Sequence, residues 1–122
     1  MRRLAAYGHS MGAFVTGQLL GSWPEDFRAA SHTAGGMNDN GPNAPRASVA
    51  GRIRTPYQLH HGDADTVVSL SLDQNLSRLL STSQVPHALI TYPGYTHEQM
   101  ALGAVMLERV RAWYTLQGVI KP

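Results

Sequence analysis

The segment AAYGHSMGAF, residues 5–14, sets a serine between two glycines, each two positions away, directly after a short apolar run. Residues 2–7 are mostly apolar and predict a buried strand, and residues 11–20 predict a helix. No spacer separates the two elements, so the chain must turn sharply at Ser10. This serine is either a nucleophile held at the tip of the turn or a small residue that merely fits there.

The residues around Ser10 favour the nucleophile. When a strand turns at once into a helix, side chains at Gly8 and Gly12 are expected to collide with neighbouring backbone. The same turn puts Ser10 at a helix start, where free backbone N–H groups can face a negative charge that develops on oxygen. We therefore predict that the N–H of Met11 contributes to an oxyanion hole.

Length and composition predict a single domain over residues 1–122. The formal net charge is only +2 and the basic residues are mostly scattered, which argues against a nucleic-acid partner. The chain has no cysteine, which excludes disulfides, thiolate metal sites and a cysteine nucleophile. The sequence has no run of about 18 apolar residues and no start that resembles a signal peptide, so we expect a soluble chain without a membrane partner. It does not indicate a cellular compartment.

Strands and helices alternate along the rest of the chain. The predicted elements are a strand over 27–33, a long loop over 35–54, a strand over 57–61, a helix that starts with a capping box of Ser71 and Gln74, a strand over 87–92 and a helix over 98–116. This order predicts an α/β fold with a mostly parallel sheet and helices on both faces.

Three polar residues follow predicted strands: Ser10 after the first, Asp65 after the third and His97 after the fourth. Active sites of such sheets lie beyond the carboxyl ends of the strands. A serine hydroxyl needs a neutral imidazole to take its proton, and that imidazole needs a carboxylate to hold its tautomer. The placement predicts a Ser-His-Asp triad, with Asp63 as a competing acid.

A metal site is the alternative interpretation of the same polar residues, because imidazoles and carboxylates together bind zinc. His60 and His61 are neighbours on a strand and point to opposite faces, so they do not easily share one ion. We therefore predict neither a metal nor a cofactor. His9, Met37 and Tyr95 are the predicted substrate-pocket residues.

The motifs GHSMG at 8–12, HGDADTVV at 61–68 and YPGYTH at 92–97 resemble the alpha/beta-hydrolase superfamily, in its serine esterase, dienelactone-hydrolase-like and prolyl-oligopeptidase-like branches. The resemblance covers nearly the whole chain but only the second half of the family's fold. It implies that Ser10 is the nucleophile and His97 the general base. It also favours Asp65 over Asp63 as the acid.

Two departures from that family pattern bear on function. Typical dienelactone hydrolases use a cysteine nucleophile, so Ser10 points toward the serine esterases and peptidases. The strands before the turn, and the loop that gives the family its second oxyanion donor, have no counterpart in this sequence. The first strand would then be a bare sheet edge, which predicts a homo-oligomer through that strand, or a separate chain that supplies the missing half.

These observations lead to one main hypothesis of function and two alternatives. The main hypothesis is a serine hydrolase that cleaves small carboxylic esters through an acyl-enzyme intermediate. The first alternative is a weak or inactive hydrolase fragment or assembly subunit. The second is a serine peptidase of the prolyl-oligopeptidase-like type.

Overall fold

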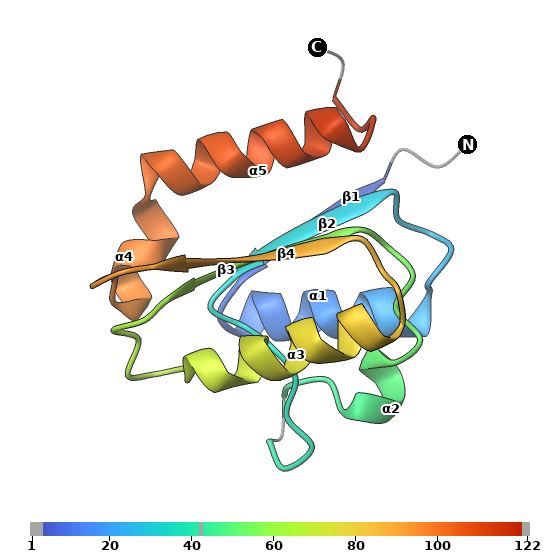
Figure 1. The fold of residues 1–122 in the computed structure, drawn as a ribbon, viewed down its shortest axis with the longest axis horizontal. Coiled ribbons are helices and arrows are strands. Elements are labelled where there is room, and N and C mark those ends of the chain that lie inside the picture. The colour runs from blue at the N-terminus through green and yellow to red at the C-terminus, as the bar shows by residue number, and fades with distance from the viewer. Residues whose placement is uncertain (1–3, 42, 121–122) are drawn as a thin grey trace.

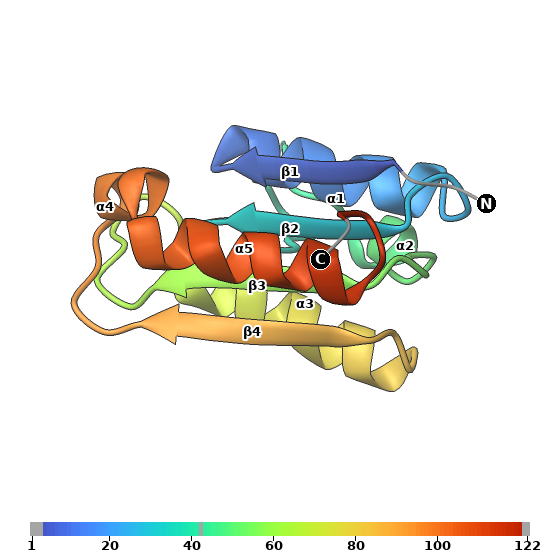
Figure 2. The same ribbon diagram turned by 90° about the horizontal axis from the view of Figure 1, so that it is seen from above.

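The structure is a computed structural model that describes residues 4–41 and 43–120. Four parallel strands form one sheet in the order β1-β2-β3-β4, and Figure 2 shows them side by side and pointing the same way. The strands are β1 (Ala5–His9), β2 (Ala29–Thr33), β3 (Tyr57–Gly62) and β4 (His87–Tyr92). Neighbours in the chain are neighbours in the sheet, so the carboxyl ends of all four strands meet at one edge.

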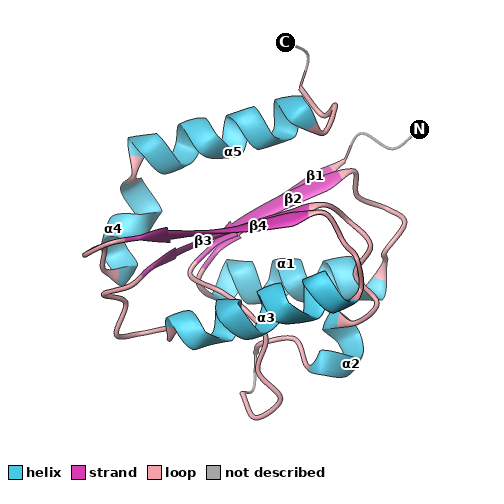
Figure 3. Cartoon of the chain, in the orientation of Figure 1, coloured by secondary structure: helices cyan, strands magenta, loops and turns pink. Residues whose placement is uncertain are grey.

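Helices cover both faces of the sheet (Figures 1 and 3). They are α1 (Met11–Ser22), α2 (Ala47–Ala50), α3 (Leu70–Thr82), α4 (His97–Leu102) and α5 (Ala104–Leu116). The helices α1, α2 and α3 lie on one face, α5 lies on the other, and α4 lies at the end where the strands finish. The predicted α/β class with a parallel sheet between helices is confirmed. Within the described residues, no helix is long and apolar enough to cross a bilayer.

The core has two parts, one on each face of the sheet. The larger cluster consists of Leu20, Ala30, Ala50, Ile53, Tyr57, Leu59, Leu76, Leu80 and Val85. The smaller cluster consists of Tyr92, Met100, Met106 and Val110. In β3, Tyr57 and Leu59 belong to the larger cluster while His60 contacts Tyr92 of the smaller one, because successive side chains of a strand point to opposite faces.

Three predicted elements differ from those observed. The last helix is not continuous, because Gly103 has an extended ψ of 117° and separates α4 from α5. The capping box does not start α3, whose N-cap is Ser69, but one does start α4, where Thr96 and Gln99 exchange side-chain bonds with each other's backbone. The second strand begins at Ala29, two residues later than predicted. Of the predicted first strand, residues 2 and 3 lie outside the described residues.

The turn from β1 into α1 is as tight as its glycines imply, but only one of the two glycines explains it. A Cβ at Gly8 would lie 2.1 Å from the carbonyl oxygen of Gly12, whereas a Cβ at Gly12 would meet no atom within 4 Å. The predicted collision at Gly12 is therefore wrong for the described residues, because that position faces open space. Ser10 itself has φ 58° and ψ −116°, a conformation that side-chain-bearing residues rarely adopt.

The two glycines make a matched pair for a stability test. Gly8→Ala should lower the free energy of unfolding by roughly 1–3 kcal/mol or more, because the added methyl must displace backbone. Gly12→Ala should be neutral or stabilising by up to about 1 kcal/mol, because alanine is the better helix former and nothing obstructs it. Urea denaturation followed by circular dichroism measures both, and equal losses would show that the close contact at Gly8 does not set the turn.

Within the described residues, β1 pairs with β2 alone and forms one edge of the sheet. Apolar side chains are exposed along this edge and on α1, which packs beneath it: Leu4 at 58%, Tyr7 at 43% and Val15 at 51% exposure. We propose that this edge pairs with the same strand of a second copy, because a two-fold axis would make the patch complementary to itself and satisfy its backbone groups.

Light scattering on the purified chain tests this pairing. We expect a dimer or a larger assembly at micromolar concentration, and a shift toward monomer in a Leu4→Lys, Val15→Lys double variant, since lysines block edge pairing. Lys substitution at the exposed Val105 on α5, away from the edge, is the control. A folded, dilute monomer of the unmodified chain would refute the proposal.

Candidate active site

Three side chains from separate segments meet at the carboxyl ends of the strands. Nε2 of His97 lies 2.8 Å from the Ser10 hydroxyl, and Nδ1 of His97 lies 2.8 Å from Oδ2 of Asp65. Ser10 stands between β1 and α1, Asp65 in the loop after β3, and His97 at the first position of α4. With Nδ1–H donating to the carboxylate, Nε2 is free to accept from the serine. Residues that are far apart in the sequence thus form one hydrogen-bond chain.

Asp65 is held from two sides. Its Oδ2 accepts from His97, while its Oδ1 accepts from the N–H groups of Val67 and Val68, both at 2.8 Å. The side chain is 0% exposed. Burial alone would raise the pKa of Asp65, but the hydrogen bonds from His97, Val68 and Val67 outweigh it and lower the pKa below the usual value. Asp65 is therefore ionised at neutral pH.

Asp63, the competing acid, bonds to a backbone N–H instead of to His97. Its Oδ1 accepts from the N–H of Gly94 at 2.7 Å, and the residue is exposed. It thus ties the loop after β3 to the loop after β4. The two aspartates of the HGDAD stretch separate into one that contacts the histidine and one that joins two loops.

His9 lies beside this hydrogen-bond chain. Its ring centroid is 4.9 Å from that of His97, and its Nδ1 lies 2.6 Å from the Thr33 hydroxyl. Burial lowers the pKa of His9, the nearby His97 lowers it further, and Asp65 opposes them. Met11 is the first residue of α1, so its N–H has no partner within the helix and lies next to Ser10.

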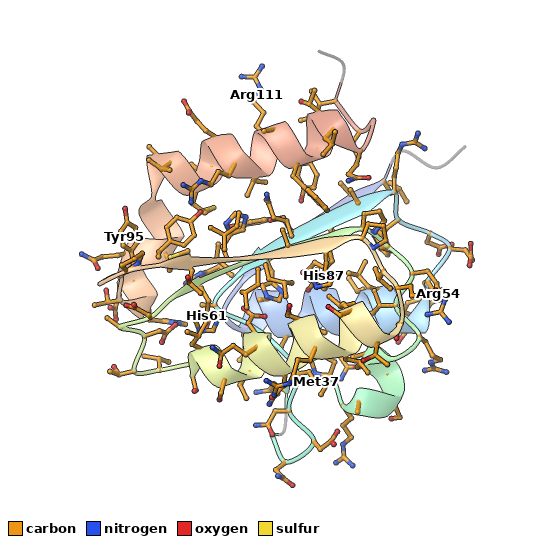
Figure 4. All side chains as sticks on the ribbon, viewed as in Figure 1. Met37, Arg54, His61, His87, Tyr95 and Arg111 are labelled. Atoms are coloured by element: carbon orange, nitrogen blue, oxygen red, sulfur yellow. The ribbon has the colours of Figure 1, made fainter. Side chains whose placement is uncertain are left out.

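Met37 and Tyr95 are not brought together. Met37 packs against the larger core cluster and Tyr95 against the smaller one. Figure 4 shows their side chains at widely separated places on the molecule. Each of the two is only partly buried and packs on a different face of the sheet, and their place in a substrate pocket stays a prediction.

A cavity of about 210 Å³ lies next to the Asp65 loop instead. Val67 and Val68, whose N–H groups hold Asp65, are part of its lining, as are Phe14 on α1, Leu72 on α3 and Asn38. Sequence analysis did not identify this cavity. Its walls come from three separate segments, and their meeting is decided only by packing.

A buried polar network under the site was also missed. Asp73 of α3 is 0% exposed and lies 2.7 Å from Nε2 of His32 and 2.8 Å from Nδ1 of His61. One sequence signal points to it: Asp73 shares a helical face with the buried Leu76 and Leu80, three and seven residues later. An acid on a buried face must find partners, and the two histidines provide them.

His60 points to the other face of β3, as the strand alternation predicts. Its Nδ1 lies 2.8 Å from the Tyr92 hydroxyl and its Nε2 lies 2.7 Å from Oε1 of Gln58. Burial, with His32 and Arg109 nearby, lowers the pKa of His60 to about 3. Across the part of the chain that the structure describes, no group of three or more histidine or acidic side chains is arranged to hold a metal ion.

Comparison with solved structures shows which fold this arrangement belongs to. A candidate dienelactone hydrolase from Klebsiella pneumoniae matches with a TM-score of 0.76 and 17% identity, over 93% of this chain and 52% of its own. A puromycin-hydrolyzing peptidase from Mycobacterium tuberculosis matches with a TM-score of 0.79 and 22% identity, over 93% of this chain and 22% of its own. An alpha/beta hydrolase enzyme from a Medee basin deep-sea metagenome library matches with a TM-score of 0.75 and 15% identity, over 93% of this chain and 53% of its own.

This chain therefore spans about half the length of the first of these proteins and less than a quarter of the peptidase. No curated protein sequence matches it. Its sequence does match the Dienelactone hydrolase family over residues 1–104. The chain belongs to the dienelactone hydrolase family, and its four-stranded sheet is the corresponding part of an alpha/beta-hydrolase fold.

Proposed function

We propose that this hydrolase cleaves carboxylic esters through an acyl-enzyme intermediate on Ser10. The observation that supports the proposal most strongly is the hydrogen-bond chain from the Ser10 hydroxyl through His97 to Asp65, with 2.8 Å at both steps. Each member supplies what the previous one needs: a proton acceptor for the serine, then a carboxylate for the imidazole.

In the acylation half-reaction, Oγ of Ser10 attacks the ester carbonyl carbon while its proton passes to Nε2 of His97. The carbonyl electrons move to oxygen, where the N–H of Met11 donates to the oxyanion. When the carbonyl re-forms, the ester C–O bond breaks and the alcohol leaves with the proton from Nε2. Asp65 stays ionised throughout and stabilises the imidazolium.

Deacylation repeats these steps with water. His97 takes a proton from water as the oxygen attacks the acyl carbon, and it returns that proton to Ser10 when the acid leaves. The low pKa of Asp65 suits this role, since a carboxylate is needed in both half-reactions.

A small ester is the substrate class that we favour. An alcohol leaves more readily than an amine, so an ester needs less oxyanion stabilisation than an amide, and Met11 is the one donor assigned here. The cavity of about 210 Å³ beside the Asp65 loop, whose lining includes the apolar side chains of Phe14, Val67, Val68 and Leu72, is a suitable place for a short acyl or alcohol group. Peptidases among the similar structures make amide cleavage the alternative to test.

Replacement of the nucleophile tests the proposal directly. Ser10→Ala should reduce hydrolysis of p-nitrophenyl acetate and butyrate by roughly 1,000-fold or more, because no acyl-enzyme can form. A phosphonate inhibitor should add its mass to Ser10 alone, as judged by peptide mass spectrometry. A p-nitroanilide substrate, assayed in parallel, separates an esterase from a peptidase.

Three results would contradict the proposal in different ways. Equal rates for the unmodified chain and Ser10→Ala would remove the catalytic role of Ser10. Labelling without turnover would favour an inactive fragment or assembly subunit. Faster cleavage of the anilide than of the ester would favour the peptidase.

The two aspartates provide a matched test of the acid. Asp65→Asn should lower kcat by roughly 10,000-fold, because the amide favours the wrong histidine tautomer. Asp63→Asn should lower kcat less than tenfold, since Asp63 contacts Gly94 rather than His97. Steady-state kinetics with p-nitrophenyl butyrate measures both, and a larger loss in Asp63→Asn would reverse the assignment.

A further inference from the structure

His61 is buried among hydrogen-bond acceptors. Its Nδ1 lies 2.8 Å from Oδ2 of Asp73, and its Nε2 lies 2.8 Å from the carbonyl oxygen of Val68. The side chain is 0% exposed and sits on the α3 side of the sheet, where Figure 4 labels it. A carbonyl oxygen and an ionised carboxylate accept hydrogen bonds and cannot donate.

The hydrogen-bond partners of His61 determine how many protons its ring must carry. Neutral imidazole has one N–H and would leave one of these two contacts without a proton, so only an imidazolium satisfies both. His32 does not share this need, because the Tyr57 hydroxyl can donate to its Nδ1 while Nε2–H donates to Asp73. One positive charge, on His61, thus balances the single carboxylate of Asp73.

The pKa shifts of His61 and Asp73 agree with a protonated His61 and an ionised Asp73. Burial alone would lower the pKa of His61, but the Asp73 carboxylate, the Val68 carbonyl and Asp65 together raise it above 6.5. Burial would likewise raise the pKa of Asp73, but His32 and His61 lower it. Both shifts favour the charged form of each group.

The imidazolium is connected to the proposed active site. Nε2 of His61 lies 3.6 Å from Oδ2 of Asp65, the same oxygen that contacts His97. Its bond to the Val68 carbonyl also holds the loop whose N–H groups bind the other oxygen of Asp65. We propose that His61, kept protonated by Asp73, is a positioning residue that holds the Asp65 loop and places a positive charge behind the proposed triad.

This inference rests on the proposed function for its effect on rate, though not for the protonation of His61. A positive charge 3.6 Å from Oδ2 of Asp65 favours the ionised form of that carboxylate, which the proposed triad needs. Among the described residues, His61 contacts the acids Asp73 from α3 and Asp65 from the loop after β3. His32 from β2 is bonded to the same Asp73, and His97 from α4 is bonded to the same Asp65.

Nitrogen-15 NMR of histidine-labelled protein tests the protonation without any assay. Of the six histidines, one ring should carry protons on both nitrogens at pH 8, and it should contact Val68. That signal should be absent in His61→Gln. Six neutral rings at pH 8 would overturn the proposal whatever the protein hydrolyses.

His61→Gln then tests the positioning role, with His60→Gln as the control. Glutamine can still donate to the Val68 carbonyl but carries no charge. We expect a loss in kcat of roughly 10- to 100-fold and an acidic limb of the pH–rate profile about one unit higher. His60 is equally buried on the opposite face, and its pKa of about 3 means that replacing it removes no charge.

The outcomes separate this inference from the proposed function. If the unmodified chain neither hydrolyses esters nor reacts with the phosphonate, the proposed function fails, while NMR still decides the protonation of His61. If the unmodified chain is active but His61→Gln and His60→Gln have the same pH profile, the positioning role is refuted. If His61→Gln does not fold, the NMR result on the unmodified chain decides.

Discussion

The close approach of Gly8 to the backbone of Gly12 is the contact on which the site depends. Without a side chain at Gly8, β1 can pass directly into α1, with the Gly12 carbonyl 2.1 Å from where a Cβ would stand. Ser10 then takes a left-handed conformation that costs about 1–3 kcal/mol. The N–H of Ser10 donates to the Thr33 carbonyl at 2.9 Å, so the neighbouring strand helps to hold the turn.

The parallel sheet determines what this turn can meet. All four strands end at one edge, so the loops after β3 and β4 carry Asp65 and His97 to Ser10. Beneath these residues lies a second polar layer, in which Asp73 contacts His32 and His61. Asp65 is thus held by His97 on one side and by a loop anchored on His61 on the other. The proposed chemistry and the buried network share that one aspartate.

Much of the fold could be predicted because strands and helices alternate along the chain and the apolar residues of α3 repeat at helical spacing. The wrong predictions of helix bounds occurred where two local sequence signals competed. Ser71 and Gln74 fit a capping box, but Ser69 lies two residues earlier and caps α3 first. Gly103 lies inside a continuous helical pattern, yet the chain is extended there and α4 and α5 separate. Met37 and Tyr95, both predicted pocket residues, pack against different core clusters, which their nearness to the motifs did not indicate.

The sequence by itself determined that Ser10, Asp65 and His97 follow strands in an α/β chain, because periodicity and glycine spacing are local properties. It also determined that His60 and His61 face opposite layers, because successive strand residues alternate. Only the tertiary structure decided that Asp73 is buried between two histidines, and that both nitrogens of His61 face acceptors. The reason is physical: an acid in the first turn of a helix is ordinary at a surface, and it becomes a buried charge only when α3 packs on β3 and β4 and brings Asp73 to His32 and His61.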